Sequence, residues 1–271
     1  MMTAASYPDP RALAHRCIDQ FIKNRCLIAA SALSYTTIVS LVPLVAILLA
    51  IFSGFPFFSN ARDRFLTVLL DNFVPGVGEQ AASWFQAVAT NAAQTTAIGA
   101  GVLVVTAILM LLTIEDQLQV IWEISDARPW RQRVLAYWVV LTLGPMLIGI
   151  GFSVPGYFGG LPWLGVFDAG ISFWLETVAF TMLYGLIPNC RVSFRDSIAG
   201  ALLAAISMEI VKFLFGVFIA RFSSYGTVYG ALAGIPIFLL WMYIFWVVVL
   251  LGAELAAALR YLGMMEDTNG R

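Results

Sequence analysis

The residues best placed to do chemistry are two charged side chains inside a long apolar segment. In AAISMEIVKFLFG, residues 204–216, Glu209 and Lys212 stand three positions apart among mostly apolar neighbours. That spacing places both on one face of an α-helix. A charge at the centre of a membrane span costs about 2.5–3.5 kcal/mol. The pair therefore predicts either a working part of a transport path or an ion pair that holds helices together, and the sequence leaves both open.

Small residues continue the helical face that carries this pair. Ala201 and Ala205 precede Glu209 on it, and Gly216 follows Lys212. Counted from the start of the apolar segment at 1.5 Å per residue, Glu209 lies about 18 Å into the span, near its middle. Small residues allow helices to approach closely, so we expect this face to turn toward other helices.

Further polar residues in apolar segments extend the candidate path. Glu176, in ISFWLETVAF, is a candidate partner for Lys212. The segment AASALSYTTIVSLVP is rich in hydroxyls, including Tyr35 and Ser40, and contains Pro43, which has no backbone N–H to donate. This pattern fits a kinked helix packed through its polar face, or a helix that lines a water-filled cavity.

Three other acidic residues lie near the ends of apolar segments. Glu115 and Asp116, in LTIEDQLQVIW, are expected at a solvated interface. Glu254, in GAELAAALR, is expected to have a structural role and to pair with Arg260 or with an arginine of a nearby loop.

The composition identifies an integral membrane protein. Of 271 residues, 61% are hydrophobic and only 11% are charged, whereas about 25% of a soluble domain is charged. A net charge of −1 and scattered basic residues argue against nucleic-acid binding. With one histidine, three unclustered cysteines and none of the common catalytic motifs, we expect no metal, no cofactor and no enzymatic activity.

The expected fold is an all-α membrane protein, a bundle of six transmembrane helices. A cytoplasmic tail and an amphipathic helix occupy residues 1–28, the membrane domain residues 29–258, and a cytoplasmic tail residues 259–271. Residues 54–96 are expected to form an external helical hairpin between the first two spans. The spans are expected near 29–53, 97–119, 134–156, 169–187, 197–219 and 229–258.

The amphipathic pattern near the N-terminus predicts a helix on the membrane surface or a simple extension of the first span. Its apolar face is expected to consist of Leu13, Cys17, Phe21 and Ile28. With the N-terminus inside, eleven of the 15 basic residues fall on the cytoplasmic side and three outside. This fits the positive-inside rule, and it places both termini and all three cysteines in the cytoplasm.

Four stretches resemble the YihY/BrkB membrane protein family. They are AASALSYTTIVSLVPLVAILLAIF, RPWRQRVLAYWVVLTLGP, IPNCRVSFRDSIAGALLAAISMEIVKFLF and YGTVYGALAGIPIFLLWMYIFWVVVLLGAELAAAL. The resemblance runs from about residue 20 to 260, although Gln119 stands where the family pattern has asparagine. Residues that match the pattern are Ala32, Tyr35, Ser40, Pro43, Trp122, Pro188, Gly200, Tyr229, Gly230, Trp241, Gly252, Ala253 and Glu254.

The resemblance implies a six-span bacterial inner-membrane protein with both termini inside, and it implies no established activity. Family members have carried virulence, serum-resistance and ribonuclease BN labels. We reject the ribonuclease label for this chain, because its sequence has neither a metal-ligand cluster nor a basic face.

Two classes of function remain. The first is a transporter or lipid-handling protein with a polar path near Glu209, Lys212, Glu176 and Tyr35, with an anionic lipid or other amphiphile as the expected substrate. The second is a non-transporting scaffold or envelope-assembly factor whose charges are packed and dry. The expected partners are membrane lipids and either a second copy of the chain or an envelope protein.

Overall fold

The computed structural model describes residues 10–54, 97–124, single positions between 129 and 143, and residues 165–190, 192–222 and 234–269. Most of the predicted third span, nearly all of the predicted hairpin at 54–96, and Tyr229 and Gly230 lie outside the described residues. Within the described part the chain is helical and contains no strand. The helices are α1 (Pro10–Lys23), α2 (Cys26–Gly54), α5 (Ala97–Ile121), α7 (Gly165–Leu186), α8 (Phe194–Phe222) and α10 (Gly234–Asn269).

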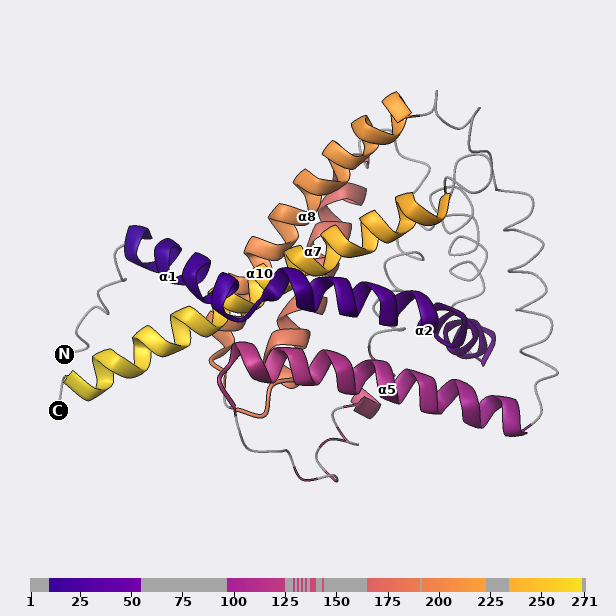
Figure 1. The fold of residues 1–271 in the computed structure, drawn as a ribbon, viewed down its shortest axis with the longest axis horizontal. Coiled ribbons are helices and arrows are strands. Elements are labelled where there is room, and N and C mark those ends of the chain that lie inside the picture. Colours follow the sequence, from indigo (N-terminus) through magenta and orange to yellow (C-terminus); the bar gives the residue numbers. More distant parts are fainter. Residues whose placement is uncertain are drawn as a thin grey trace.

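Helices α8 and α10 form the centre of the fold and cross in Figure 1. At the crossing, a Cβ atom built on Gly200 would lie 2.4 Å from the carbonyl oxygen of Gly252 and 2.9 Å from the Cβ of Ala256. Only small residues allow two backbones to come this close. Beyond the crossing the axes of the two helices separate gradually (Figure 1), but they stay in contact, since the ring of Phe215 on α8 lies 4.7 Å from that of Trp241 on α10. Helix α8 also packs against α7.

The buried core contains aromatic side chains of α7 and α10. Tyr184 of α7 is fully buried; its ring stacks on Phe180 and its hydroxyl donates to the carbonyl of Val249 at 2.7 Å. Trp246 of α10 donates its indole N–H to the hydroxyl of Thr37 on α2 at 2.9 Å. These bonds satisfy the polar atoms of buried aromatics and tie α7 and α2 to α10.

Helix α1 packs on the carboxyl-terminal half of α10, at the end of the molecule where α10 ends (Figure 1). Cys17 is buried, and Leu13 and Phe21 are half-buried. The predicted apolar face was wrong at Ile28, which is exposed on α2. The reason is a helix break: Arg25 has φ 51°, so the left-handed turn resets the helical register before α2 begins. Helix α10 also continues past residue 258 to Asn269, through the segment expected to be a tail.

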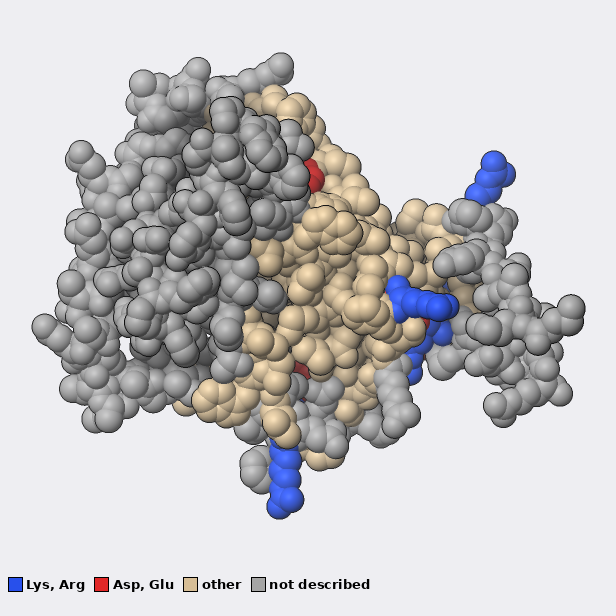
Figure 2. Space-filling view, turned by 180° about the vertical axis from the view of Figure 1, so that it is seen from behind, with Lys and Arg blue, Asp and Glu red and all other residues tan. Residues whose placement is uncertain are grey.

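Much of the described surface is apolar. Figure 2 shows a face on which basic side chains stand at the margins of a broad uncharged area. Exposed side chains include Trp174, Phe213 and Leu214. Two stretches, Phe194–Ile219 and Pro236–Leu262, are long and apolar enough to cross a bilayer, while Cys26–Ser40 and Phe173–Leu186 are shorter apolar helices among the described residues.

Candidate functional site

Glu176, Glu209 and Lys212 form one charged cluster where α7 and α8 lie together. The Nζ atom of Lys212 donates to Oε1 of Glu209, one turn earlier on α8, at 2.9 Å. The same ammonium donates to Oε1 of Glu176 on α7. The candidate pairing of Lys212 with Glu176 is therefore confirmed. With all three groups ionised, two carboxylates face one ammonium, and the cluster carries one surplus negative charge.

The charged cluster is partly open. The side chain of Glu209 is 45% exposed, that of Lys212 35% and that of Glu176 28%. The Oε2 atom of Glu176, in contrast, is buried and has no hydrogen-bond partner in the described structure. An acceptor in that position can take a proton or a donor group of a ligand.

The α8 face that carries the cluster is packed before the cluster and open after it. Ala201 and Ala205 are fully buried, as the small-residue pattern predicts. Gly216 is exposed, and a Cβ atom built there would meet nothing within 4 Å. The expectation that the whole face turns toward other helices was therefore wrong at Gly216. The neighbouring residue Phe215 contacts Trp241 of α10, and Gly216 is turned about 100° away from it around α8.

The hydroxyls of α2 do not join the cluster. Tyr35 is 69% exposed, Ser40 is buried, and among the described residues neither is hydrogen-bonded to Glu176, Glu209 or Lys212. Pro43 lies within the continuous helix α2. Four other hydroxyls donate to the carbonyl four residues earlier on the same helix: Ser31, Ser34, Thr36 and Thr37. This bonding favours a helix packed through its polar face for the described part of α2.

Glu115 is the clearest correction to the sequence analysis. Its side chain is 0% exposed, whereas a solvated interface was expected. Nε of Arg133 lies 3.2 Å from both carboxylate oxygens, Gln119 donates at 2.7 Å, and the hydroxyl of Tyr137 also donates. Arg133 and Tyr137 stand four residues apart, a spacing that places them on one helical face and that the sequence offered as a signal. Gln119, the departure from the family pattern, supplies one of the donors.

Glu254 is buried, in keeping with a structural role, but the predicted arginine partner was wrong. Its Oε1 atom accepts from Nδ2 of Asn24 at 2.7 Å and from Sγ of Cys26 at 3.3 Å. Arg260 lies six residues further along α10, which turns it by about 120° from Glu254 on a helix of 3.6 residues per turn. The contact instead ties the α1–α2 junction to α10.

The remaining residues of the family pattern are mostly packing residues. Trp122 and Pro188 are buried, Gly200 and Gly252 form the α8–α10 crossing, and Trp241 packs its ring 4.7 Å from that of Phe215. In the part of the chain that the structure describes, no three His, Cys, Asp or Glu side chains gather as a metal site.

Apolar helices of membrane length with buried ion pairs define a helical membrane protein. The model of the family described as "Virulence factor BrkB" matches residues 17–270. The chain belongs to this family, whose similar members are named UPF0761 membrane proteins.

Three relatives illustrate the similarity. The chain is 40% identical to the UPF0761 membrane protein of Nitrosospira multiformis over 95% of its own length and 63% of the relative's. It is 36% identical to that of Aeromonas salmonicida over 89% of this chain and 86% of the relative. It is 40% identical to the UPF0761 membrane protein of Pseudoalteromonas translucida over 90% of this chain and 83% of the relative. The chain thus spans less than two thirds of the length of some relatives, and no solved structure matches it.

Proposed function

We propose that this protein moves or handles an amphiphilic molecule along a polar path that passes the cluster of Glu176, Glu209 and Lys212. The observation that carries the proposal is that these charges, one on α7 and two near the middle of α8, are paired yet partly open. In the proposed arrangement the chain forms a six-span bundle in the bacterial inner membrane with both termini in the cytoplasm. It works without enzymatic activity and without nucleic acid.

Partly open charges in a membrane must meet water, lipid or another protein. Contact with lipid tails carries a large desolvation cost, so water or a second protein surface is favoured. Water at the cluster would make the adjoining faces of α7 and α8 one wall of a polar path. Transporters commonly place charged groups at such broken or open positions near the midplane.

The charge balance of the cluster refines the expected substrate. Two carboxylates compete for one ammonium, and Oε2 of Glu176 is an unused acceptor. Of the anionic lipid or other amphiphile expected from the sequence, this balance favours an amphiphile that brings an amine or another donor group, or a proton that accompanies transport.

The second candidate is a scaffold or envelope-assembly factor in which another protein covers the cluster. The exposed apolar side chains of α8 beyond Glu209, including Phe213 and Leu214, fit an apolar contact as well as they fit lipid. A second copy of the chain or an envelope protein would then seal the charges from water.

Cysteine accessibility at Gly216 separates the two candidates. Gly216 has open space around it and lies one turn beyond Lys212 on the same face of α8. Ala205 is fully buried, so a cysteine at that position would test only how tightly the helices pack. In a background with Cys17, Cys26 and Cys190 replaced by serine, Gly216→Cys is treated with a charged thiol reagent in intact cells and in inverted vesicles. A polar path predicts labelling from at least one side.

Two controls match this variant. Ala205→Cys should stay unlabelled because it is packed, and Phe213→Cys should stay unlabelled because a thiol facing lipid cannot ionise. Protection at position 216 from both sides, together with disulfide crosslinking of two copies through Gly216→Cys, would reject the path and establish the sealed interface.

A further inference from the structure

A second polar site lies beside the crossing of α8 and α10, on the side of α10 that faces α1 and the end of α5. A pocket of about 270 Å³ opens there between α1, the end of α5 and residues 254–261 of α10. The apolar stretch of α10 ends here, at Leu262. In a membrane this is the level of the lipid headgroups, where phosphates and amines meet basic and aromatic side chains.

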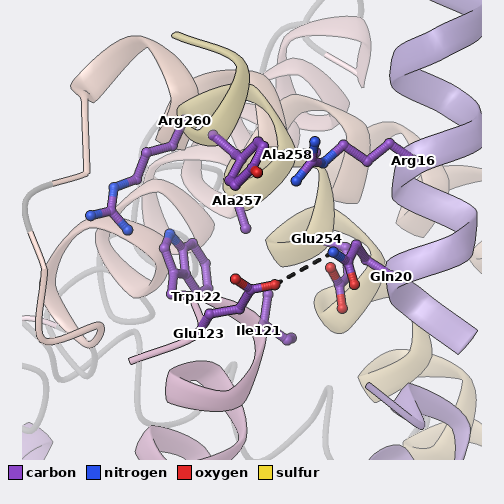
Figure 3. Close-up of a pocket in the computed structure, with 10 residues that line it drawn as sticks. Arg16, Gln20, Ile121, Trp122, Glu123, Glu254, Ala257, Ala258 and Arg260 are labelled. Carbon is purple, nitrogen blue, oxygen red and sulfur yellow. Dashed lines mark hydrogen bonds between the residues drawn. The ribbon is translucent and has the colours of Figure 1, made fainter. Parts of the chain in front are cut away.

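One side of the pocket presents hydrogen-bond donors. Arg16 and Arg260 both line it (Figure 3), and in the described part of the chain neither has a carboxylate within ion-pair distance. The guanidinium of Arg16 is held 3.5 Å from the ring centroid of Tyr261, which fixes its position without neutralising it. Guanidinium groups suit the oxygens of a phosphate.

The third donor is the indole of Trp122. This side chain is 5% exposed, and its Nε1 atom has no acceptor among the described residues. Figure 3 shows the nitrogen on the edge of the ring that faces Ala257 and Arg260. A tryptophan N–H is a donor only, and a buried donor without an acceptor is rare in folded proteins. A ligand oxygen in the pocket would satisfy it.

The opposite side of the pocket carries negative charge. Glu123 stands at the turn after α5 in a left-handed conformation, φ 53°, and its carboxylate receives only a long hydrogen bond of 3.5 Å from Gln20. Figure 3 places Glu123 across the pocket from Arg260 and Arg16. The other lining carboxylate, Glu254, is already engaged by Asn24 and Cys26. The site thus offers donors for an anion on one side and one available carboxylate on the other.

We propose that this pocket binds a phosphorylated amine. The phosphate accepts from Arg260 and from the indole of Trp122, Arg16 approaches it from the opposite side, on α1, and the ammonium faces Glu123. A zwitterionic lipid headgroup and a soluble phosphodiester of the same chemistry both meet these requirements. The site uses none of the residues of the proposed path, so either proposal can fail alone.

Binding to the purified full chain in a nonionic maltoside detergent tests the site. Dihexanoyl phosphatidylethanolamine is titrated against the matching phosphatidylglycerol, and Arg16→Gln with Arg260→Gln is compared with the parent. Loss of two charge-assisted contacts should weaken binding of the ethanolamine lipid at least about tenfold. Trp122→Phe keeps a ring in place and should weaken it about three- to tenfold. Lys23→Gln, on the same helix as Arg16 but outside the pocket lining, should change it less than about twofold.

A change in the preference between the two lipids cannot be caused by a variant that merely folds less well. Glu123→Gln removes the partner of the ammonium, so it should reduce the preference for the ethanolamine over the glycerol lipid. Glycerophosphoethanolamine, which has no acyl chains, distinguishes a soluble ligand from a lipid. If it binds as tightly as the ethanolamine lipid, the natural ligand is soluble. If only the lipid binds, the pocket is a site for a lipid headgroup. Unchanged affinity in the double arginine variant, or an unchanged lipid preference in Glu123→Gln, overturns the proposal.

Discussion

Gly200 and Gly252 meet backbone to backbone where α8 crosses α10. A Cβ atom on Gly200 would lie 2.4 Å from the carbonyl oxygen of Gly252, and one on Gly252 would lie 2.7 Å from the carbonyl oxygen of Gly200. The contact is reciprocal, and both carbonyl oxygens belong to the backbone, which cannot rotate away as a side chain can. The hydroxyl of Tyr184 also lies 2.6 Å from a Cβ atom built on Gly252. The crossing fixes the distance between α8 and α10 at the end of α8 that precedes the cluster around Lys212.

A methyl group at this crossing should separate the two helices. We expect Gly200→Ala to reduce the free energy of unfolding by about 1–3 kcal/mol, the usual cost of overpacking. Thermal unfolding of the purified protein in detergent measures the effect. Gly216→Ala is the matched control, because the open space there costs nothing and alanine is the better helix former. Equal melting temperatures for the two variants would show that the crossing is not tight in solution.

The buried carboxylate of Glu115 should depend on Arg133. Arg133→Gln leaves a fully buried carboxylate with hydrogen bonds from Gln119 and Tyr137 but without a compensating charge. Removing one partner of a buried ion pair costs about 3–5 kcal/mol. We expect a loss of this order in unfolding experiments, and a smaller one, about 1 kcal/mol, for Tyr137→Phe.

A double substitution separates charge from shape at this site. Glu115→Gln combined with Arg133→Gln removes both charges and keeps hydrogen-bonding groups of similar size. The double variant should be more stable than Arg133→Gln alone, because no unpaired charge remains buried. The single variant Glu115→Gln completes the comparison. If the stability lost in the double variant equals the sum of the losses in Glu115→Gln and Arg133→Gln, the two side chains do not stabilise each other.

Apolar segments and charge spacing were enough to predict much of the fold. Long apolar runs predicted five helices that the structure contains, within a few residues for α2, α5 and α8. The three-residue spacing of Glu209 and Lys212 predicted their contact, because helical geometry alone fixes it. Glu176 could be named as a candidate partner because few ionisable residues share its depth.

Contacts between distant segments were harder to predict. Glu115 looked solvated because its depth was judged from its own helix, while its burial depends on Arg133 and Tyr137 folding back over it. Glu254 was assigned to the nearest arginine, although its partners are more than 200 residues earlier in the chain. The pocket at Trp122 escaped notice for the same reason, since three helices that are far apart in the sequence build it.

Cys17 should react slowly with thiol reagents. Burial, with a further contribution from the negative charge of Glu254, raises the pKa of the Cys17 thiol to about 11 from an ordinary 9.0. The thiolate is the reactive form, so alkylation at pH 8 should be about 100-fold slower in the folded protein than after denaturation. The rate is measured with iodoacetamide in a Cys26→Ser and Cys190→Ser background. His15→Cys, with Cys17→Ala, provides an exposed comparison on the same helix.

The same pKa predicts how stability changes in alkaline solution. The pKa of Cys17 is higher in the folded than in the unfolded chain, so its contribution to stability is complete below pH 9 and is lost as the pH rises toward 11. The parent protein should therefore lose more stability over this interval than Cys17→Ala. Parallel pH profiles for the two proteins would contradict a buried, neutral thiol.

The bond from Asn24 to Glu254 should hold the junction of α1 and α2 closed to proteases. Asn24 lies between Lys23 and Arg25, two trypsin sites, and Arg25 occupies a left-handed turn where α1 ends and α2 begins. Glu254→Ala removes the acceptor of Asn24 and Cys26, so trypsin should cut here several times faster. Glu254→Gln keeps one acceptor oxygen and should protect the junction almost as well as glutamate. Equal cutting of both variants and the parent would mean that the packing of Cys17 and Phe21 on α10 holds the junction without this bond.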